Sequence, residues 1–412
     1  MQSSRLFRSA LSLRATCCLP SNLIAPAASP RAAISHIPSR SYASKNDDNN
    51  SNTDRLKGPV SSPNMLQSVK NTIAENLGAT YIPGAHTLAP ADQRFSLDQV
   101  PDLSGKVALV TGGSEGIGYG CTHTLLTHNI SKLFIISQSP DVISDAISAI
   151  SSELGQDKAS RVVWLQCDLS DWEQTGRTAL TIAKQTNRLD IVINNAGRGI
   201  MTYQLAKNGI DLHMATNHFG HVVLTSHLLP LLKTTASNGH KVRIVQLGSN
   251  LHEQAPSDTQ FASVDELNTD YGPQPQYGRS KLAAILYAKY LHRHVHATHP
   301  NILSNAVHPG IVETRQSTQH IHEAFPLLGY GMSVGAAPFK KTQFEGAVSA
   351  MFAATSTEHS GLYVCPPAIV EEGSAKANDV ELGERLMELT VRVVKEKTKS
   401  QSVDKGCPFA LS

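Results

Sequence analysis

Short runs rich in β-branched residues alternate with amphipathic helical patterns from residue 106 onward, and this alternation constrains the fold more than any other feature. The predicted strands are Lys106–Thr111, Lys132–Ser137, Arg161–Cys167, Leu189–Asn194, Val242–Leu247 and Leu303–Val307. The predicted helices include Gly118–His128, Asp141–Leu154, Trp172–Thr186, Leu212–Thr234 and Tyr277–His296. Such alternation indicates right-handed βαβ crossovers and an α/β fold with a doubly wound parallel sheet. Ligands of such sheets bind at the carboxyl ends of the strands.

The first 42 residues differ from the rest of the chain in charge. They contain no Asp or Glu and five arginines, which are Arg5, Arg8, Arg14, Arg31 and Arg40. An acid-free segment of this kind that can form an amphipathic helix is typical of a mitochondrial presequence, with a disordered basic tail as the alternative. The run Arg40-Ser41-Tyr42-Ala43 resembles a matrix-processing site. We therefore expect a mitochondrial protein whose mature form starts near Ala43.

The charge of the remaining 370 residues limits the partners of the protein. They carry 31 basic and 34 acidic side chains, so the positive net charge of the whole chain belongs to the first 42 residues. A nucleic-acid-binding protein concentrates positive charge on its folded part, so no nucleic acid is expected as a partner. No run of 18 or more apolar residues is present, so no transmembrane span is expected.

The chain divides into four predicted parts. Residues 1–42 are the presequence, 43–100 a linker with a short helical arm, 101–398 one catalytic domain, and 399–412 a tail. Ser62-Pro63 can begin the arm helix, since Leu66, Val69, Ile73 and Leu77 follow at helical spacing. This helix is expected to dock on its own domain, with peripheral membrane contact as the alternative. A homo-oligomer also stays open.

A glycine-rich turn follows the first predicted strand. It reads Thr111-Gly112-Gly113-Ser114-Glu115-Gly116-Ile117-Gly118 and leads directly into a helix. Glycines permit a tight turn and close approach of the backbone to a pyrophosphate, which the helix N-terminus favours electrostatically. Such a turn alone is a weak signal, but its place between a strand and a helix favours a dinucleotide site. Gly112, Ser114, Gly116, Ile117 and Gly118 are its candidate binding residues.

Several segments together resemble one protein family. The glycine spacing is similar to the T-G-x-x-x-G-x-G pattern of the short-chain dehydrogenases/reductases. In the same order, Cys167-Asp168-Leu169 follows the third strand, Asn194-Asn195-Ala196-Gly197 the fourth, and Pro309-Gly310-Ile311-Val312-Glu313-Thr314 the sixth. The resemblance covers roughly residues 103–397. It implies a Rossmann-type fold and a nicotinamide dinucleotide cofactor.

The resemblance also assigns cofactor contacts. Asp168 is expected to bind the adenine ring, and Asn194 and Asn195 to steady the sheet and the adenosine ribose. Val312 and Thr314 belong to the segment that contacts the nicotinamide carboxamide in the family. The end of the second strand separates the two cofactors, because an acid there favours NAD and a base favours NADP. Ser137 and Gln138 stand there, so NADP(H) is favoured slightly and NAD(H) is the alternative.

Two Tyr-x-x-x-Lys pairs could supply a proton donor and a cation on one helical face. Tyr203 precedes Lys207 but comes before the fifth strand, whereas Tyr277 precedes Lys281 and comes after it. We therefore favour Tyr277 and expect Tyr203 to be a surface or pocket-wall residue. By the family resemblance, Tyr277 is the acid/base and Lys281 binds the nicotinamide ribose and lowers the pKa of the tyrosine.

Two further residues complete the expected catalytic set. By the same resemblance, Ser249 at the end of the fifth strand polarises the substrate oxygen. Asn217, in Ala215-Thr216-Asn217-His218, supports the lysine through water. The many histidines, including His213, His218, His221 and His227 on one predicted helix, lack a carboxylate or cysteine motif. No metal is therefore expected.

The substrate is expected to be a small-molecule carbonyl or alcohol. The interval from Ser249 to Tyr277 spans 28 residues, and such a lengthened segment resembles the branch of retinol dehydrogenases and WW-domain oxidoreductases, which often take lipophilic substrates. The apolar run 325–332 suggests a pocket lid. The alternative function is a non-catalytic dinucleotide-binding subunit of a mitochondrial assembly, although such proteins usually lose the tyrosine or the lysine.

Overall fold

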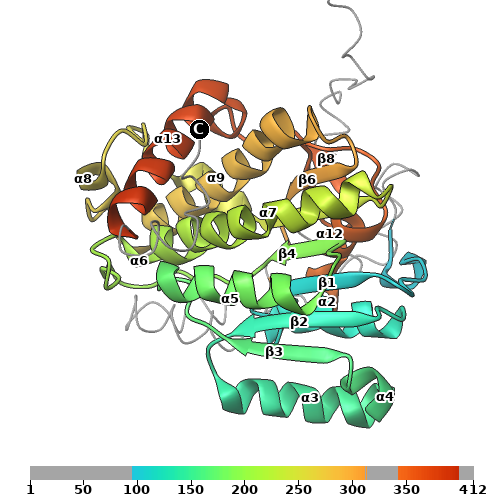
Figure 1. The fold of residues 1–412 in the computed structure, drawn as a ribbon. Coiled ribbons are helices and arrows are strands. Elements are labelled where there is room, and N and C mark those ends of the chain that lie inside the picture. Colours follow the sequence, from blue (N-terminus) through green and yellow to red (C-terminus); the bar gives the residue numbers. More distant parts are fainter. Residues whose placement is uncertain (1–94, 311, 313–341, 399–412) are drawn as a thin grey trace, which may run out of the picture. The chain divides into compact units, whose positions relative to one another are not determined.

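The computed structural model describes residues 95–310, 312 and 342–398, and within them one sheet of eight strands lies between two layers of helices (Figure 1). The strands are β1 Val107–Thr111, β2 Lys132–Ser137, β3 Val162–Gln166, β4 Ile191–Asn194, β5 Val242–Leu247, β6 Ile302–Val307, β7 Tyr363–Cys365 and β8 Ile369–Glu371. Their order is β3-β2-β1-β4-β5-β6-β7-β8. The first seven pair in parallel, and β8 is antiparallel to β7. The predicted doubly wound parallel sheet is confirmed.

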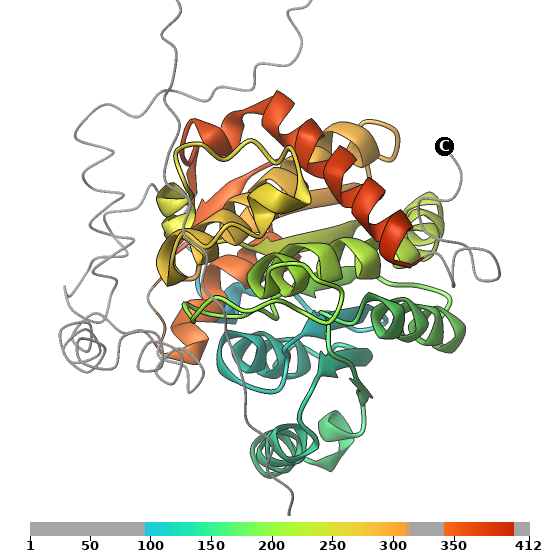
Figure 2. The same ribbon diagram turned by 90° about the vertical axis from the view of Figure 1, so that its left-hand side faces the viewer.

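Helices cover both faces of this sheet, as the two views show (Figure 2). One layer consists of α2 Gly116–Thr127, α3 Pro140–Leu154 and α12 Gln343–Thr355. The other consists of α5 Trp172–Gln185, α7 His221–Ser237 and α9 Pro273–Leu291, with α13 Val380–Lys397 packed on α9. Because helices bury both faces, β1, β4 and β5 read as nearly continuous buried runs rather than as alternating ones.

The local sequence explains where the helices begin. The side chain of Ser139 accepts a hydrogen bond from the backbone amide of Val142, and Pro140 occupies the first turn of α3. Asp171 caps α5 through the amide of Gln174. The short elements α4 Gln156–Ala159, α6 Leu212–Met214 and α8 Val264–Leu267, and the 3-10 turns η3 Leu97–Gln99, η5 Asn250–Gln254 and η8 Lys376–Asn378, connect the main layers.

The structure changes some predicted boundaries. The predicted helix Leu212–Thr234 consists of α6, a π-helical segment η4 at Ala215–Gly220, and α7. The helix predicted to begin at Tyr277 starts at Pro273, because Gly272 adopts φ +85° ahead of a proline in the first turn. It ends in a second π-helical segment, η6 His292–His296. The short strands β7 and β8 were not predicted.

Several predictions fall outside the described residues: the presequence, the arm helix near residues 62–77, Thr314, the apolar run 325–332 and the tail 399–412. Among the helices that the structure does describe, none is long and apolar enough to cross a membrane. The site described below depends only on residues 95–310, 312 and 342–398.

Candidate active site

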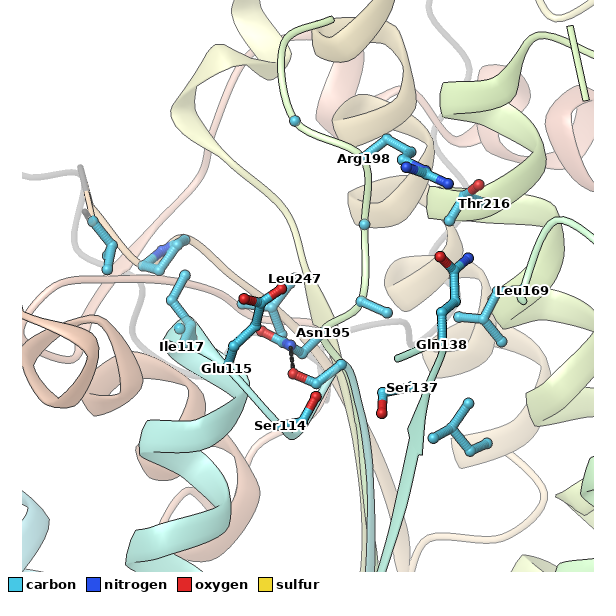
Figure 3. Close-up of a pocket in the computed structure, with 18 of the residues that line it drawn as sticks. Ser114, Glu115, Ile117, Ser137, Gln138, Leu169, Asn195, Arg198, Thr216 and Leu247 are labelled. Atoms are coloured by element: carbon cyan, nitrogen blue, oxygen red, sulfur yellow. Dashed lines mark hydrogen bonds between the residues drawn. The ribbon is translucent and has the colours of Figure 1, made fainter. Parts of the chain in front are cut away.

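A cavity of about 340 Å³ lies at the carboxyl ends of the parallel strands, beside the point where the strand order reverses at β1. Figure 3 shows part of its wall. Its lining within the described residues comes from the glycine-rich turn, the ends of β2, β4 and β5, and helices α2, α3 and α9. It includes Gly112, Ser114, Glu115, Gly116, Ile117, Ser137, Gln138, Leu169, Asn195, Arg198, Thr216, Ser249, Tyr277, Lys281 and Val312.

The glycine-rich turn is built so closely that side chains are excluded from it. Gly112 adopts φ +62°, a conformation that favours glycine. A Cβ at Gly118 would lie 2.0 Å from the carbonyl oxygen of Gly112 and 2.5 Å from Nδ2 of Asn195. Gly118 therefore shapes the turn without lining the cavity, whereas Ser114, Gly116 and Ile117 line it. The turn sits at the N-terminus of α2, where an anionic pyrophosphate fits.

Hydrogen bonds fix this turn to the end of β4. Nδ2 of Asn195 donates to the carbonyl oxygens of Thr111, at 2.9 Å, and Gly112, at 3.2 Å. The hydroxyl of Thr111 accepts from the amides of Asn195 and Ala196, each at 2.9 Å. Asn194 points elsewhere, since its Nδ2 donates to Thr225 in the core. The two asparagines thus differ, because Asn195 lines the cavity and Asn194 braces the sheet.

Only some of the residues predicted to contact the adenosine half of the cofactor line the cavity. Ser137 and Gln138 line the cavity at the end of β2, and the Ser137 hydroxyl accepts a hydrogen bond from Nε1 of Trp164. Asp168 is not among the lining residues, and its carboxylate accepts hydrogen bonds from the amide and hydroxyl of Ser170. Its neighbour Leu169 lines the cavity instead. The adenine contact of Asp168 stays a prediction.

At the other end, Ser249, Tyr277 and Lys281 meet in the same cavity. Ser249 follows β5 and caps η5 by accepting from the amide of Leu251. Tyr277 and Lys281 lie one turn apart on α9, with Nζ of Lys281 5.5 Å from the centre of the Tyr277 ring. The ammonium also donates to the carbonyl oxygen of Leu247 at 2.8 Å. The end of β5 thus positions both the serine and the lysine.

Burial shifts the pKa values of both Tyr277 and Lys281. It raises the pKa of Tyr277 to about 12, while the hydrogen bond to the Ser249 side chain acts in the opposite direction. Burial lowers the pKa of Lys281 to about 8. At neutral pH the phenol therefore keeps its proton and most of the lysine is charged. The tyrosine is in the state that a proton donor requires.

Asn217 lies in the π-helical segment η4 and supports the site through its neighbours. Its Oδ1 accepts from the amide of Arg198 at 2.7 Å, and its Nδ2 donates to the carbonyl oxygen of Arg198 at 3.1 Å. The same Nδ2 donates to Oγ of Ser280, the residue before Lys281, at 2.9 Å. Asn217 thus joins the segment after β4 to α9. π-helical turns of this kind are frequent at functional sites.

The competing Tyr-Lys pair lies elsewhere. Tyr203 is in an irregular segment rather than on a helix, its hydroxyl donates to the carbonyl oxygen of Asn268 at 2.9 Å, and it does not line the cavity. Val312 does line the cavity, whereas Thr314 lies outside the described residues.

The histidines make structural contacts. Nε2 of His213 contacts the carbonyl oxygen of Gly199, His218 contacts Thr390, and His221 contacts Thr111. Burial lowers the pKa of His218 to about 3 and that of His221 to about 4, so both are neutral at pH 7. In residues 95–310, 312 and 342–398, no three His, Cys, Asp or Glu side chains are grouped so as to hold a metal ion.

Polar residues that were not predicted also line the cavity, among them Glu115, Arg198 and Thr216. Arg198 follows Gly197 directly, so its place one residue beyond the motif after the fourth strand was the available signal. Glu115 lies inside the glycine-rich turn. Thr216 precedes Asn217, and only the π-helical geometry of η4 shows that it reaches the cavity wall.

Fold and cavity together define a dinucleotide-binding α/β protein. The profile of the short chain dehydrogenase family matches residues 106–324. A mitochondrial oxidoreductase named bli-4 from Neurospora crassa is 53% identical over 349 residues, covering 84% of this chain and 83% of that protein. The human polyprenol dehydrogenase is 30% identical over 268 residues, covering 64% of this chain and 76% of the human one. The chain belongs to the short-chain dehydrogenase/reductase family and is an NAD(P)-dependent oxidoreductase.

Solved structures agree with the fold. A protein from Mycobacterium paratuberculosis superposes with a TM-score of 0.55 at 22% identity, covering 73% of this chain and 97% of that one. A 3-oxoacyl (acyl-carrier-protein) reductase from Agrobacterium tumefaciens superposes with a TM-score of 0.50 at 20% identity, covering 66% and 97%. At this level of identity the likeness supports the Rossmann-type fold alone.

Proposed function

We propose that the protein transfers a hydride between NADP(H) and a lipophilic carbonyl or alcohol, using Ser249, Tyr277, Lys281 and Asn217. The observation that carries this proposal is the meeting of Ser249, Tyr277 and Lys281 in the cavity that also contains the glycine-rich turn. The name of the human relative, polyprenol dehydrogenase, supports a lipophilic substrate.

In the direction of reduction, each residue has a separate task. The Ser249 hydroxyl holds and polarises the carbonyl oxygen. The Oη–H bond of Tyr277 breaks and its proton passes to that oxygen, which becomes the hydroxyl of the product. Lys281 offsets the negative charge left on the phenolate. A bound nicotinamide supplies or accepts the hydride. Asn217 keeps the segment after β4 in register with α9.

A screen of carbonyls and alcohols with the purified protein tests this proposal, with consumption or formation of NAD(P)H followed by absorbance. Turnover of a long-chain prenyl or retinoid aldehyde, but not of its polar short-chain analogues, is the expected result. Tight dinucleotide binding without turnover of any carbonyl would instead favour a non-catalytic dinucleotide-binding subunit.

We propose further that residues 1–42 direct the protein to the mitochondrion. These residues combine five arginines with an absence of acids, and the Neurospora relative is named as mitochondrial. A reporter fused behind Met1–Lys45 should be imported, since a basic amphipathic segment responds to the import machinery and the membrane potential. Changing Arg5 and Arg8 to Glu should abolish most of the import, as measured by fractionation and protease protection. A cytosolic reporter from the unmodified fusion would contradict the proposal.

A further inference from the structure

Arg198 places a positively charged side chain in the cavity wall. The charged side chains among the described lining residues are Glu115, Arg198 and Lys281. The ammonium of Lys281 lies at the catalytic end of the cavity, where it donates a hydrogen bond to the carbonyl oxygen of Leu247. In contrast, no carboxylate within the described ranges forms an ion pair with the Arg198 guanidinium. A guanidinium placed this way is suited to an anionic group of a ligand.

Two hydrogen bonds hold the backbone of Arg198 in place. Its amide donates to Oδ1 of Asn217 at 2.7 Å, and its carbonyl oxygen accepts from Nδ2 of the same side chain at 3.1 Å. Both ends of one buried amide therefore fix the residue relative to η4. The point at which the Arg198 side chain leaves the backbone is therefore set by the packing of η4.

A second polar group lies at the same end of the cavity. Thr216 is 5% exposed, and its Oγ1 has no hydrogen-bond partner among the residues that the structure describes. Figure 3 shows the side chains of Arg198, Thr216 and Gln138 pointing toward one another. All three can donate hydrogen bonds, so an acceptor with several oxygens would satisfy them together. A phosphate has this chemistry.

The place of these three side chains in the cavity indicates which phosphate of the cofactor they would bind. Gln138 stands at the end of β2, where this fold distinguishes a free ribose 2′-hydroxyl from a 2′-phosphate. The pyrophosphate site at the glycine-rich turn, marked by Ser114 and Ile117, lies in another part of the wall in Figure 3. Glu115 belongs to that part as well, and Figure 3 shows its carboxylate apart from the Arg198 guanidinium.

We infer that Arg198, assisted by Thr216 and Gln138, binds the 2′-phosphate of NADP(H). The arginine after the fourth strand thereby replaces a base that is missing at position 138. This inference rests on the proposed use of NADP(H) and names the residue that would produce the preference.

The test compares dissociation constants for NADPH and NADH, measured by calorimetry on the full chain. Arg198→Gln should weaken NADPH binding by about 10- to 100-fold, the range for a charge-assisted hydrogen bond. NADH binding should change by less than about threefold. Thr216→Val should weaken NADPH binding by about 2- to 10-fold, as for a neutral hydrogen bond. Arg177→Gln, an exposed change on α5, is the matched control and should alter neither constant.

A rescue experiment separates charge from structure. Adding Gln138→Arg to the Arg198→Gln protein should restore most of the affinity for NADPH, because the positive charge returns to the same end of the cavity. Equal losses for NADPH and NADH would contradict the inference, since they would place Arg198 on a group that both cofactors share. An unchanged NADPH affinity in Arg198→Gln would also contradict it. Failure of the unmodified protein to bind either dinucleotide would contradict the proposed function itself.

Discussion

Tyr277→Phe should reduce turnover by about 100- to 10,000-fold, the range expected when a general acid is lost. The change removes only the hydroxyl, whose proton the mechanism passes to the substrate oxygen. The ring stays to pack beside Lys281, so folding and dinucleotide binding should largely persist. Steady-state kinetics with a substrate from the screen, together with a cofactor titration of the variant, measure both parts of this prediction.

Tyr203→Phe is the matched control, because Tyr203 also precedes a lysine by four residues. Its hydroxyl donates to Asn268 outside the cavity, so turnover should stay within a few-fold of the unmodified protein. Equal activities of the Tyr277→Phe and unmodified proteins would refute the proton-donor assignment. A large loss in Tyr203→Phe alone would reverse the choice between the two tyrosines.

The raised pKa of Tyr277 sets the pH dependence of the two directions. Burial raises this pKa to about 12 in the protein without cofactor, so the protonated donor is present throughout the neutral range. Oxidation of an alcohol needs the phenolate as a base, and the phenolate fraction grows as pH rises toward the pKa. Oxidation should therefore increase from neutral to alkaline pH, whereas reduction should not.

Lys281→Met should cause the second large loss, at least about 100-fold in turnover, together with weaker cofactor binding. Methionine keeps the length and apolar stem of the lysine but removes the charge that stabilises the phenolate. The pH profile for oxidation should move upward in any residual activity, since ionisation of Tyr277 loses its nearby cation. A merely structural role for Lys281 would lower activity without moving this profile.

Lys289→Met provides the control on the same helix. Burial also lowers the pKa of Lys289 to about 8, but its ammonium donates to Asn378, away from the cavity. This variant should keep its turnover, its pH profile and its cofactor affinity. If both lysine variants lost activity equally, disruption of α9 rather than loss of a catalytic charge would explain the results.

The parallel sheet and much of the site could be predicted from sequence because both depend on local patterns. β2 and β5 match their predicted bounds, since each is a short run of mostly apolar and β-branched residues with clear breaks. Strand order then places the residues after β1, β4 and β5 at one edge of the sheet. The resemblance to the short-chain dehydrogenases/reductases added Tyr277 and Lys281 to Ser249, and the cavity contains all three.

Other features depend on geometry that local patterns do not encode. The π-helical turn η4 orients Thr216 and Asn217, yet its sequence fits the periodicity of an ordinary helix. Asp168 follows its strand as expected and its carboxylate accepts a hydrogen bond from Ser170, whereas its neighbour Leu169 lines the cavity. Arg198 was not predicted because it lies one residue beyond the motif, and only the structure shows that it lines the cavity.

Transfer of deuterium from NADPH that is deuterated at both C4 positions tests hydride transfer to a carbonyl directly. The protein would be incubated with this cofactor and a set of lipophilic aldehydes and ketones, and the products examined by mass spectrometry. The proposed mechanism predicts an alcohol with one deuterium on the carbinol carbon, and a yield that falls sharply in Tyr277→Phe. Saturable binding of NADPH with no deuterium in any product across the set would contradict the account and indicate a dinucleotide-binding protein that does not catalyse hydride transfer.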